Sequence, residues 1–258
     1  MENIIYNEDC EETLKRMGES YIDGVITSPP YNIIRPNVDG RGYDVYNDGM
    51  SNEEYIDFTL RIFNQFDRVI KPNGVVLYNM SYGSENTEVM SLTVADIIRN
   101  TDFTLADIMI WKKSSATPNN VSKNKLTRIV EYIYVFCRKS ELKTFNANKK
   151  VIGERSSGQP IYEVKYNFMT AKNNDGSNDL NKATFSSEMV TKLIDIYIKE
   201  GSLIYDPFMG TGTTAVSLIR NGCSYIGSEL SPQQVEYANN RITKEDIQID
   251  DTLSSILF

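Results

Sequence analysis

The chain has 258 residues and a formal net charge of −8, with 40% hydrophobic and 10% aromatic residues. This composition can form the core of one α/β domain with a small insert, which excludes a mostly disordered chain. Histidine is absent, so Ser–His and Cys–His nucleophile pairs are excluded and no metal site is expected.

The predicted elements alternate between strands and helices along the chain. Strands are expected at residues 4–7, 21–27, 75–80, 105–111, 129–137, 202–206 and 224–227. Helices are expected at residues 10–17, 51–69, 88–99, 186–197, 213–220 and 232–242. Apolar residues between Tyr55 and Val69, for example, recur at spacings of three and four, which is typical of an amphipathic helix. The alternation predicts an α/β fold with a doubly wound, mostly parallel sheet.

Three features bear on the location of the protein. No apolar run approaches the roughly 20 residues that span a bilayer, so we expect no association with a membrane. The acidic first residues lack the positive region of an export signal. The three cysteines, Cys10, Cys137 and Cys223, are scattered and odd in number, which suits a reducing compartment. These features predict a cytoplasmic protein.

Basic residues are concentrated in one part of the chain. Residues 111–172 contain 13 Lys and Arg residues against 4 Asp and Glu residues, whereas the rest of the chain has a net charge of −17. This asymmetry is expected where one face meets nucleic-acid phosphates, although a solvated basic surface without a ligand would show the same counts. Residues 138–182 have the weakest periodicity and form the candidate insert, so residues 1–137 and 183–258 are the expected main domain.

The first candidate site follows the strand that begins at Leu203. This strand ends at Asp206, and a Gly210-Thr211-Gly212 turn then leads into a helix. Glycines let the backbone approach a ligand, and a carboxylate at the next strand end, Glu229, can accept hydrogen bonds from ribose hydroxyls. The pattern favours an adenosine-containing cofactor, although such a turn can also simply pack a helix on a strand. The Gly-Lys-Ser/Thr of a phosphate-binding P-loop is missing.

The second candidate site is the turn Thr27-Ser28-Pro29-Pro30-Tyr31-Asn32, which follows a predicted strand. The prolines lack N–H groups, so the turn offers mainly acceptors: backbone carbonyls and the Ser28 hydroxyl. Such a group can hold an exocyclic amine by its two hydrogens while the ring of Tyr31 lies against the base. An ordinary proline turn beside an incidental tyrosine would look the same.

The two motifs together resemble those of the β-class DNA methyltransferases, which modify exocyclic amino groups with S-adenosylmethionine in restriction–modification systems. Residues 5–10, 54–74, 110–113 and 131–136 also resemble segments of this family. The order of catalytic turn, basic insert and cofactor loop is typical of the β-class and unlike that of ribosomal-RNA and protein-glutamine methyltransferases. The resemblance implies a Rossmann-like methyltransferase fold with permuted motifs and a target-recognition insert at residues 138–182.

The resemblance also implies roles for individual residues. The catalytic group would be Ser28, Pro29, Pro30 and Tyr31, with Tyr31 stacking on a base flipped out of the duplex. The cofactor contacts would be Asp9, Cys10, Asp206, Phe208, Gly210, Gly212, Thr213, Glu229 and Leu230. Plain core positions would equally explain Phe208 and Leu230, and a helix cap would explain Asp9. The family often has His and Pro before its last cofactor helix. Here the segment reads NKATFSSE, so Lys182, Thr184 or Ser186 would meet the carboxylate end of the cofactor.

Serine at the first position of the Pro-Pro turn is typical of N4-cytosine enzymes in this family, and aspartate or asparagine of N6-adenine enzymes. We therefore expect cytosine, with adenine as the alternative and a non-catalytic DNA-binding subunit as a further one. Motif order argues against an RNA or small-molecule substrate. A homodimer and a cognate restriction endonuclease are partners that the resemblance leaves open. The candidate DNA contacts are Lys112, Lys113, Lys123, Lys125, Arg128, Lys149, Lys150 and Arg155.

Overall fold

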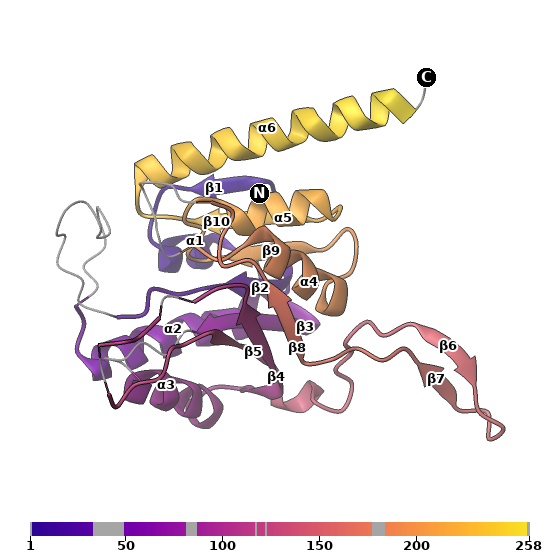
Figure 1. The fold of residues 1–258 in the computed structure, drawn as a ribbon, viewed down its shortest axis with the longest axis horizontal. Coiled ribbons are helices and arrows are strands. Elements are labelled where there is room, and N and C mark those ends of the chain that lie inside the picture. The colour runs from indigo at the N-terminus through magenta and orange to yellow at the C-terminus, as the bar shows by residue number, and fades with distance from the viewer. Residues whose placement is uncertain are drawn as a thin grey trace.

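The computed structural model describes residues 2–32, 49–80, 87–116, 118–121, 123–176 and 184–256. In these residues, eight strands form one sheet that lies between two groups of helices (Figure 1). The strands of this sheet are β1 (Ile4–Tyr6), β2 (Ile22–Thr27), β3 (Ile70–Met80), β4 (Phe103–Lys113), β5 (Val130–Arg138), β8 (Phe168–Ala171), β9 (Leu203–Asp206) and β10 (Ser224–Ser228). A separate two-stranded hairpin consists of β6 (Val151–Glu154) and β7 (Pro160–Tyr162).

The strand order of the sheet is β1-β10-β9-β2-β3-β5-β4-β8. The strands from β1 to β3 in this order are parallel to one another. In contrast, β5 is antiparallel to both β3 and β4, and β8 is parallel to β4. The predicted α/β class with a doubly wound, mostly parallel sheet is confirmed.

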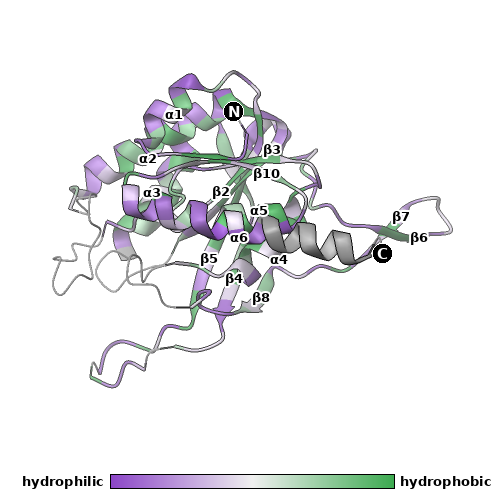
Figure 2. Ribbon diagram, turned by 90° about the horizontal axis from the view of Figure 1, so that it is seen from above, coloured by the Kyte–Doolittle hydropathy of each residue, from purple (hydrophilic) through white to green (hydrophobic). Residues whose placement is uncertain are grey.

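Helices cover both faces of the sheet. One face is covered by α1 (Cys10–Arg16), α2 (Asn52–Val69) and α3 (Thr87–Asn100), and the other by α4 (Ser187–Tyr197), α5 (Thr213–Arg220) and α6 (Pro232–Ile256). A short 3₁₀ helix (Lys139–Glu141) follows β5. Figure 2 shows hydrophobic residues gathered along the strands between the helices. No helix in the described residues has both the length and the apolar composition needed to cross a membrane.

The helix α2 illustrates how the sequence pattern forms these layers. Its buried side chains include Tyr55, Phe58 and Phe66, which lie on one face because their spacing follows the helical repeat. Full burial of one such aromatic side chain stabilises the fold by about 2 kcal/mol. At the start of the helix, Ser51 and Glu54 form a capping box that satisfies two backbone N–H groups.

Three of the differences between the structure and the predicted elements concern the main sheet and its helices. Residues 71–74, expected as a turn, belong to β3, where a register shift between its pairs with Ile22 and Gly24 accommodates them. The edge strand β8 was not expected, because four residues are too few to show a period. The helix α6 continues past Ile242 to Ile256, since no Gly or Pro follows to end it.

The strand order reverses between β9 and β2. From β9 the chain crosses to β10 on one side, and from β2 it crosses to β3 on the other side. In open α/β sheets, ligands bind beyond the carboxyl ends of the strands at such a point. Both sequence motifs begin there, because Asp206 is the last residue of β9 and Thr27 is the last residue of β2.

The candidate insert leaves the sheet at the edge opposite to the carboxyl ends of β2 and β9. β5 ends at Arg138, which pairs with Phe103 at the beginning of β4. The following β6–β7 hairpin projects from the rest of the molecule, on the right of Figure 1, and its strand residues are all exposed. β8 then returns to the main sheet within the range 138–182. Target recognition by this range stays a prediction.

Candidate active site

A buried carboxylate ties the two motifs together. Thr27 Oγ1 donates to Asp206 Oδ1 at 2.7 Å, and the same oxygen accepts the backbone N–H of Phe208 at 3.0 Å. The other oxygen, Oδ2, accepts from Thr214 Oγ1 at 2.6 Å. Burial raises the pKa of Asp206 from its ordinary value of 3.8 to about 6, although the hydroxyl groups of Thr214 and Thr27 act in the opposite direction. The ends of β2 and β9 and the start of α5 are therefore held at fixed positions.

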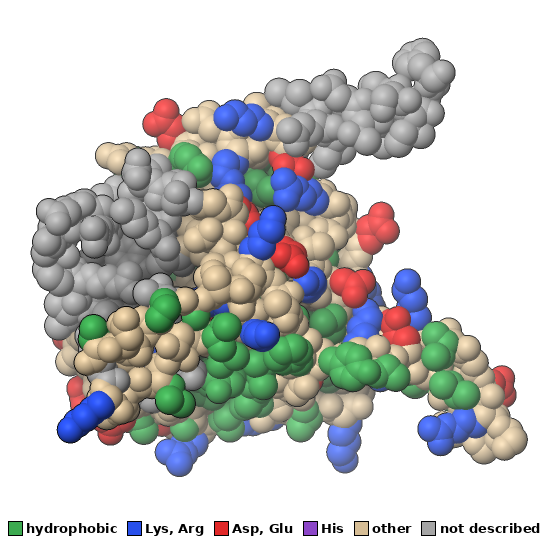
Figure 3. All heavy atoms as spheres, viewed as in Figure 1, with side chains coloured by type: hydrophobic (Ala, Val, Ile, Leu, Met, Phe, Trp, Pro, Cys, Tyr) green, Lys and Arg blue, Asp and Glu red, His purple; other side chains and the backbone are tan. Residues whose placement is uncertain are grey.

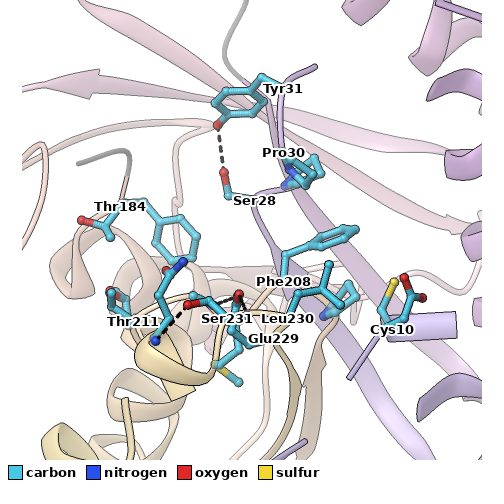
Figure 4. Close-up of a pocket in the computed structure, with 18 of the residues that line it drawn as sticks. Cys10, Ser28, Pro30, Tyr31, Thr184, Phe208, Thr211, Glu229, Leu230 and Ser231 are labelled. Carbon is cyan, nitrogen blue, oxygen red and sulfur yellow. Dashed lines mark hydrogen bonds between the residues drawn. The ribbon is translucent and has the colours of Figure 1, made fainter. Parts of the chain in front are cut away.

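Above these strand ends lies a cavity of about 220 Å³. Figure 4 shows Ser28, Pro30 and Tyr31 on one side of it and Phe208, Leu230 and Glu229 on the other. The predicted residues that line it are Ser28, Pro29, Pro30, Tyr31, Asp9, Cys10, Phe208, Gly210, Thr213, Glu229 and Leu230. Two predicted cofactor residues, Asp206 and Gly212, do not line it. Both candidate sites therefore share one cavity.

The carboxylate of Glu229 is fixed by backbone donors. Gly210 N donates to Glu229 Oε2 at 2.8 Å, and Ser231 N donates to Glu229 Oε1 at 2.9 Å. Each carboxylate oxygen has more than one lone pair, so a bond from a backbone N–H does not by itself prevent it from accepting another hydrogen bond. The carboxylate is thus oriented to bind two neighbouring hydroxyl groups.

Gly212 has a different role from Gly210. It has a φ of 81° and stands at the N-cap of α5. A Cβ atom at this position would lie 2.8 Å from the Cβ of Ala238 in α6. Glycine is therefore required at position 212 by the left-handed backbone and by the close approach of α6.

The right-hand end of the cavity in Figure 4 is apolar, with Phe208, Leu230 and Cys10 around it. Asp9 also lines this end, and its carboxylate accepts the backbone N–H of Glu11 at 2.8 Å as the N-cap of α1. The helix-cap interpretation of Asp9 is therefore correct, and the residue still faces the cavity. Apolar side chains of this kind can enclose an aromatic ring system.

The opposite end of the cavity carries Thr184 and Thr211 (Figure 4). Thr211 Oγ1 is buried and has no hydrogen-bond partner in the described part of the chain. Ser186 caps α4 by accepting from Met189 N at 3.3 Å, and Lys182 lies outside the described residues. An unpartnered buried hydroxyl at this end, a carboxylate between the ends and an apolar opposite end fit S-adenosylmethionine.

The acceptors in the turn of residues 28–31 differ in whether they already take part in a hydrogen bond. Ser28 Oγ and Tyr31 OH share a hydrogen bond of 2.8 Å. Tyr55 OH donates to the carbonyl oxygen of Pro30 at 2.9 Å, whereas no bond to the carbonyl of Pro29 is found among the described residues. The sequence predicts Tyr55 only as part of an amphipathic helix, because helical spacing does not show where a phenol oxygen points. In the described turn, the Ser28 hydroxyl and the Pro29 carbonyl are therefore the candidate acceptors for a ligand in the cavity.

A polar network that the sequence analysis missed lies behind this turn. Asn79, at the end of β3, donates through Nδ2 towards Ser28, Tyr31 and Glu131. Glu131, on β5, forms a salt bridge with Lys113 at the end of β4. The sequence signal was weak, because Asn79 and Glu131 are single polar residues within predicted buried strands.

The structure separates the predicted DNA contacts into two groups. Lys112, Lys113, Lys123, Lys125 and Arg128 lie at the end of β4 or in the connection to β5, at the same edge of the sheet as Ser28. Lys149, Lys150 and Arg155 lie on or beside the projecting hairpin, where Figure 3 shows basic side chains at the surface. Lys113 is paired with Glu131, which makes it less available for a phosphate.

Comparison with known proteins gives one family. The model of the N6_N4_Mtase family, described as DNA methylase, matches residues 22–240. The orphan methyltransferase M.BamHII of Bacillus amyloliquefaciens is 27% identical, over 88% of this chain and 91% of its own. The PvuII DNA methyltransferase (cytosine-N4-specific) shares the fold with a TM-score of 0.70, at 18% identity over 95% of this chain and 91% of that one. The M1.HpyAVI–SAM complex matches with a TM-score of 0.63, at 21% identity over 93% and 98%.

Proposed function

The chain belongs to the N6/N4 family of DNA methylases, and on this premise we propose that it methylates the exocyclic N4 amine of cytosine in DNA. The observation that carries the proposal is that Ser28 and Pro29 share one cavity with Gly210 and Glu229. An amine inside a duplex is inaccessible to such a cavity, so the target base is flipped out of the helix.

The cofactor of this family is S-adenosylmethionine, which supplies a methyl group activated by a sulfonium charge. In the proposed complex, Glu229 binds the ribose hydroxyls through the oxygens that Gly210 and Ser231 hold in place. Phe208 and Leu230, which line the cavity, would hold the adenine ring. Apolar contact there and hydrogen bonding at Glu229 together fix the orientation of the cofactor.

Further cofactor contacts are proposed at both ends of the cavity. Asp9 and Cys10, which line the cavity, would hold the adenine edge, and Thr213 would contact the cofactor beside the glycine turn. Asp206 and Gly212 act indirectly, because they set the position of the turn without lining the cavity.

The chemistry asks the protein mainly for orientation and electrostatics. The lone pair of an aromatic amine is delocalised into its ring. When Ser28 Oγ and the Pro29 carbonyl accept the two amino hydrogens, the nitrogen is drawn towards tetrahedral geometry and its lone pair becomes available. The attraction grows as positive charge develops on the nitrogen, so these acceptors stabilise the transition state more than the ground state. Tyr31 stacks on the extruded base in this proposal.

The choice of cytosine rests on Ser28, the residue typical of N4-cytosine enzymes, and the family model itself covers both N6 and N4 amines. The test is to incubate the protein with S-adenosylmethionine and DNA, digest the DNA and identify the methylated nucleoside by mass spectrometry. N4-methylcytosine supports the proposal. N6-methyladenine alone would replace cytosine by adenine, and the absence of any methylated nucleoside would favour a non-catalytic DNA-binding subunit.

DNA contact is proposed for both groups of basic residues, those near Ser28 and those on the hairpin. A homodimer and a cognate restriction endonuclease stay predictions. Analytical ultracentrifugation at working concentrations tests the first of these, and a sedimentation coefficient of a monomer would exclude it.

A further inference from the structure

The side chain of Arg241 reaches the glycine turn near the threonine end of the cavity, where Thr184 and Thr211 lie. Its Nη1 atom donates to the carbonyl oxygen of Thr211 at 2.8 Å and to Thr213 Oγ1 at 3.2 Å. Arg241 belongs to α6 and is not one of the described residues that line the cavity. An effect of this guanidinium on a bound cofactor therefore passes through the residues that it holds.

Arg241 fixes one peptide group of the glycine turn. Gly210 has a φ of 54° and Gly212 a φ of 81°, so Thr211 stands between two residues of left-handed conformation. The peptide group after Thr211 is held at both ends. Its N–H, from Gly212, donates to the Met209 carbonyl at 3.0 Å, and its carbonyl accepts from Arg241. Glycines by themselves leave a turn free to rotate, so these two bonds fix the direction of the Thr211 side chain.

Thr211 carries a hydroxyl that a ligand can use. The residue is 1% exposed and lines the cavity (Figure 4). Its Oγ1 has no hydrogen-bond partner in the part of the chain that the structure describes. A buried hydroxyl without a partner costs free energy, and a ligand that bonds to it removes this cost. With adenine at the apolar end, S-adenosylmethionine would bring its amino acid to the threonine end. The ammonium and the carboxylate of that amino acid can each bond to a hydroxyl.

The same guanidinium is linked to the start of α4. Arg241 Nη2 donates to Asp175 Oδ2 at 2.9 Å. Asp175 Oδ1 accepts from the backbone N–H of Ser187 at 2.7 Å and from its hydroxyl at 2.9 Å. Ser187 is the first residue of α4, and Thr184 and Phe185 just before it line the cavity. Asp175 thus orients the guanidinium and connects the glycine turn with the other wall of the threonine end.

We propose that Arg241, oriented by Asp175, is a positioning residue that directs the hydroxyl of Thr211 to the amino-acid end of S-adenosylmethionine. This deepens the proposed function, on which it rests. Asp175 lies in the candidate insert of residues 138–182, so the insert takes part in cofactor binding. In the proposed complex the adenosine is held elsewhere, around Glu229 and Phe208. Arg241 therefore contributes to the affinity for the amino acid and not to that for the adenosine.

Two ligands separate these contributions. S-adenosylhomocysteine and 5′-methylthioadenosine have the same adenosine and an uncharged sulfur, and only the first carries the amino acid. The dissociation constant of 5′-methylthioadenosine divided by that of S-adenosylhomocysteine, which we call the ligand ratio, measures the contribution of the amino-acid end. Calorimetry gives both constants without DNA, by displacement for the weaker ligand.

In Arg241→Met, we expect the ligand ratio to fall by about tenfold, the size expected for one buried hydrogen bond. Methionine keeps the unbranched apolar stem of arginine, and an unchanged affinity for 5′-methylthioadenosine shows that the variant is folded. If both ligands lose affinity equally, or if the ratio stays at the wild-type value, the proposal is overturned.

Asp175→Asn is a second variant, which carries the test if Arg241→Met does not fold. Whichever way the amide turns, its NH₂ group faces a donor of Arg241 or of Ser187, so one of the two links of Asp175 is lost. The ligand ratio should fall in this variant too, and a wild-type ratio would overturn the proposal.

Thr211→Val tests whether Arg241 acts through the hydroxyl of Thr211. Valine keeps the shape of threonine and removes the hydroxyl, so the ligand ratio should fall. The double variant of Thr211→Val with Arg241→Met should show no further fall, because the hydroxyl to be directed is already gone. A ratio that falls by the product of the two single effects would mean that the two side chains act independently, which would overturn the proposal.

Arg220→Met is the matched control for the loss of one guanidinium. Arg220 lies on α5, and its side chain forms an ion pair at 2.7 Å with Glu245 on α6. This variant loses the same charge and should keep the wild-type ligand ratio. A fall as large as that in Arg241→Met would attribute the effect to charge and overturn the proposal. Wild-type protein that yields no methylated nucleoside would refute the proposed function, whereas a methylated nucleoside with an unchanged ligand ratio in Arg241→Met would refute only the role of Arg241.

Discussion

The buried carboxylate of Asp206 should make the protein less stable as the pH rises, and Asp206→Asn should remove this dependence. Asparagine keeps the shape and the Oδ1 acceptor for Thr27 and Phe208 N. The hydroxyl of Thr214, which donates to Oδ2 in the wild type, can rotate to accept from the new amide. The substitution therefore removes the charge and leaves the hydrogen-bond pattern nearly intact.

The magnitude follows from the pKa, which burial raises from 3.8 to about 6. Between these values the folded protein binds a proton that the unfolded chain has lost, so protonation stabilises the fold below pH 3.8 and this contribution is lost as the pH rises through about 6. A difference of about two pH units at about 1.4 kcal/mol each gives about 3 kcal/mol. The free energy of unfolding of Asp206→Asn relative to wild type should rise by about this amount between pH 3.5 and pH 8.

Urea unfolding of both proteins at a series of pH values measures this difference. Asp102→Asn, at an exposed position, is a matched control for the loss of one carboxylate. We expect the curves of wild type and Asp206→Asn to converge at acidic pH and to separate at neutral pH. A difference that is constant with pH, or one in which wild type gains relative to the variant as pH rises, would refute the assignment of a raised pKa to Asp206.

Three further predictions concern the proposed activity. Ser28→Ala removes an acceptor for the amine, so the methylation rate should fall by about a hundredfold or more while the dissociation constant for the cofactor, measured by calorimetry, stays the same. Glu229→Gln places an NH₂ group against the backbone N–H of Gly210 or of Ser231, and should raise the dissociation constant for the cofactor by about tenfold. Reversal of Lys149 and Lys150 to Glu should weaken DNA binding and flatten its salt dependence, measured by fluorescence anisotropy.

For each of these three predictions, a specific experimental result would contradict it. An unchanged methylation rate in Ser28→Ala would remove the hydroxyl from the chemistry and favour a binding subunit. Unaltered cofactor affinity in Glu229→Gln would exclude the ribose contact. If the salt dependence of DNA binding is unchanged after the double reversal, the hairpin lysines do not contact the DNA. Lys199→Glu, at an exposed position after α4, is the control for a general effect of charge.

The amino-acid sequence alone predicts the layers and the two motifs. Helical spacing from Tyr55 to Val69 and the run of β-branched and aromatic residues in β5 depend only on neighbours along the chain. The same is true of the glycine turn after β9 and the Pro-Pro turn after β2. These signals depend on residues that are close together in the sequence, so they can be interpreted without knowledge of the strand order.

The tertiary structure decided which side chains meet. Thr27 and Asp206 are 179 residues apart, and Asn79 and Glu131 are 52 apart, so their hydrogen bonds exist only because β9 lies beside β2 and β5 beside β3. A period of 2 or 3.6 assigns a residue to a face but does not specify its partner on another strand. The sequence could therefore locate the cofactor turn and the catalytic turn. The anchoring role of Asp206 and the network behind Ser28 depend on which strands are neighbours in the sheet.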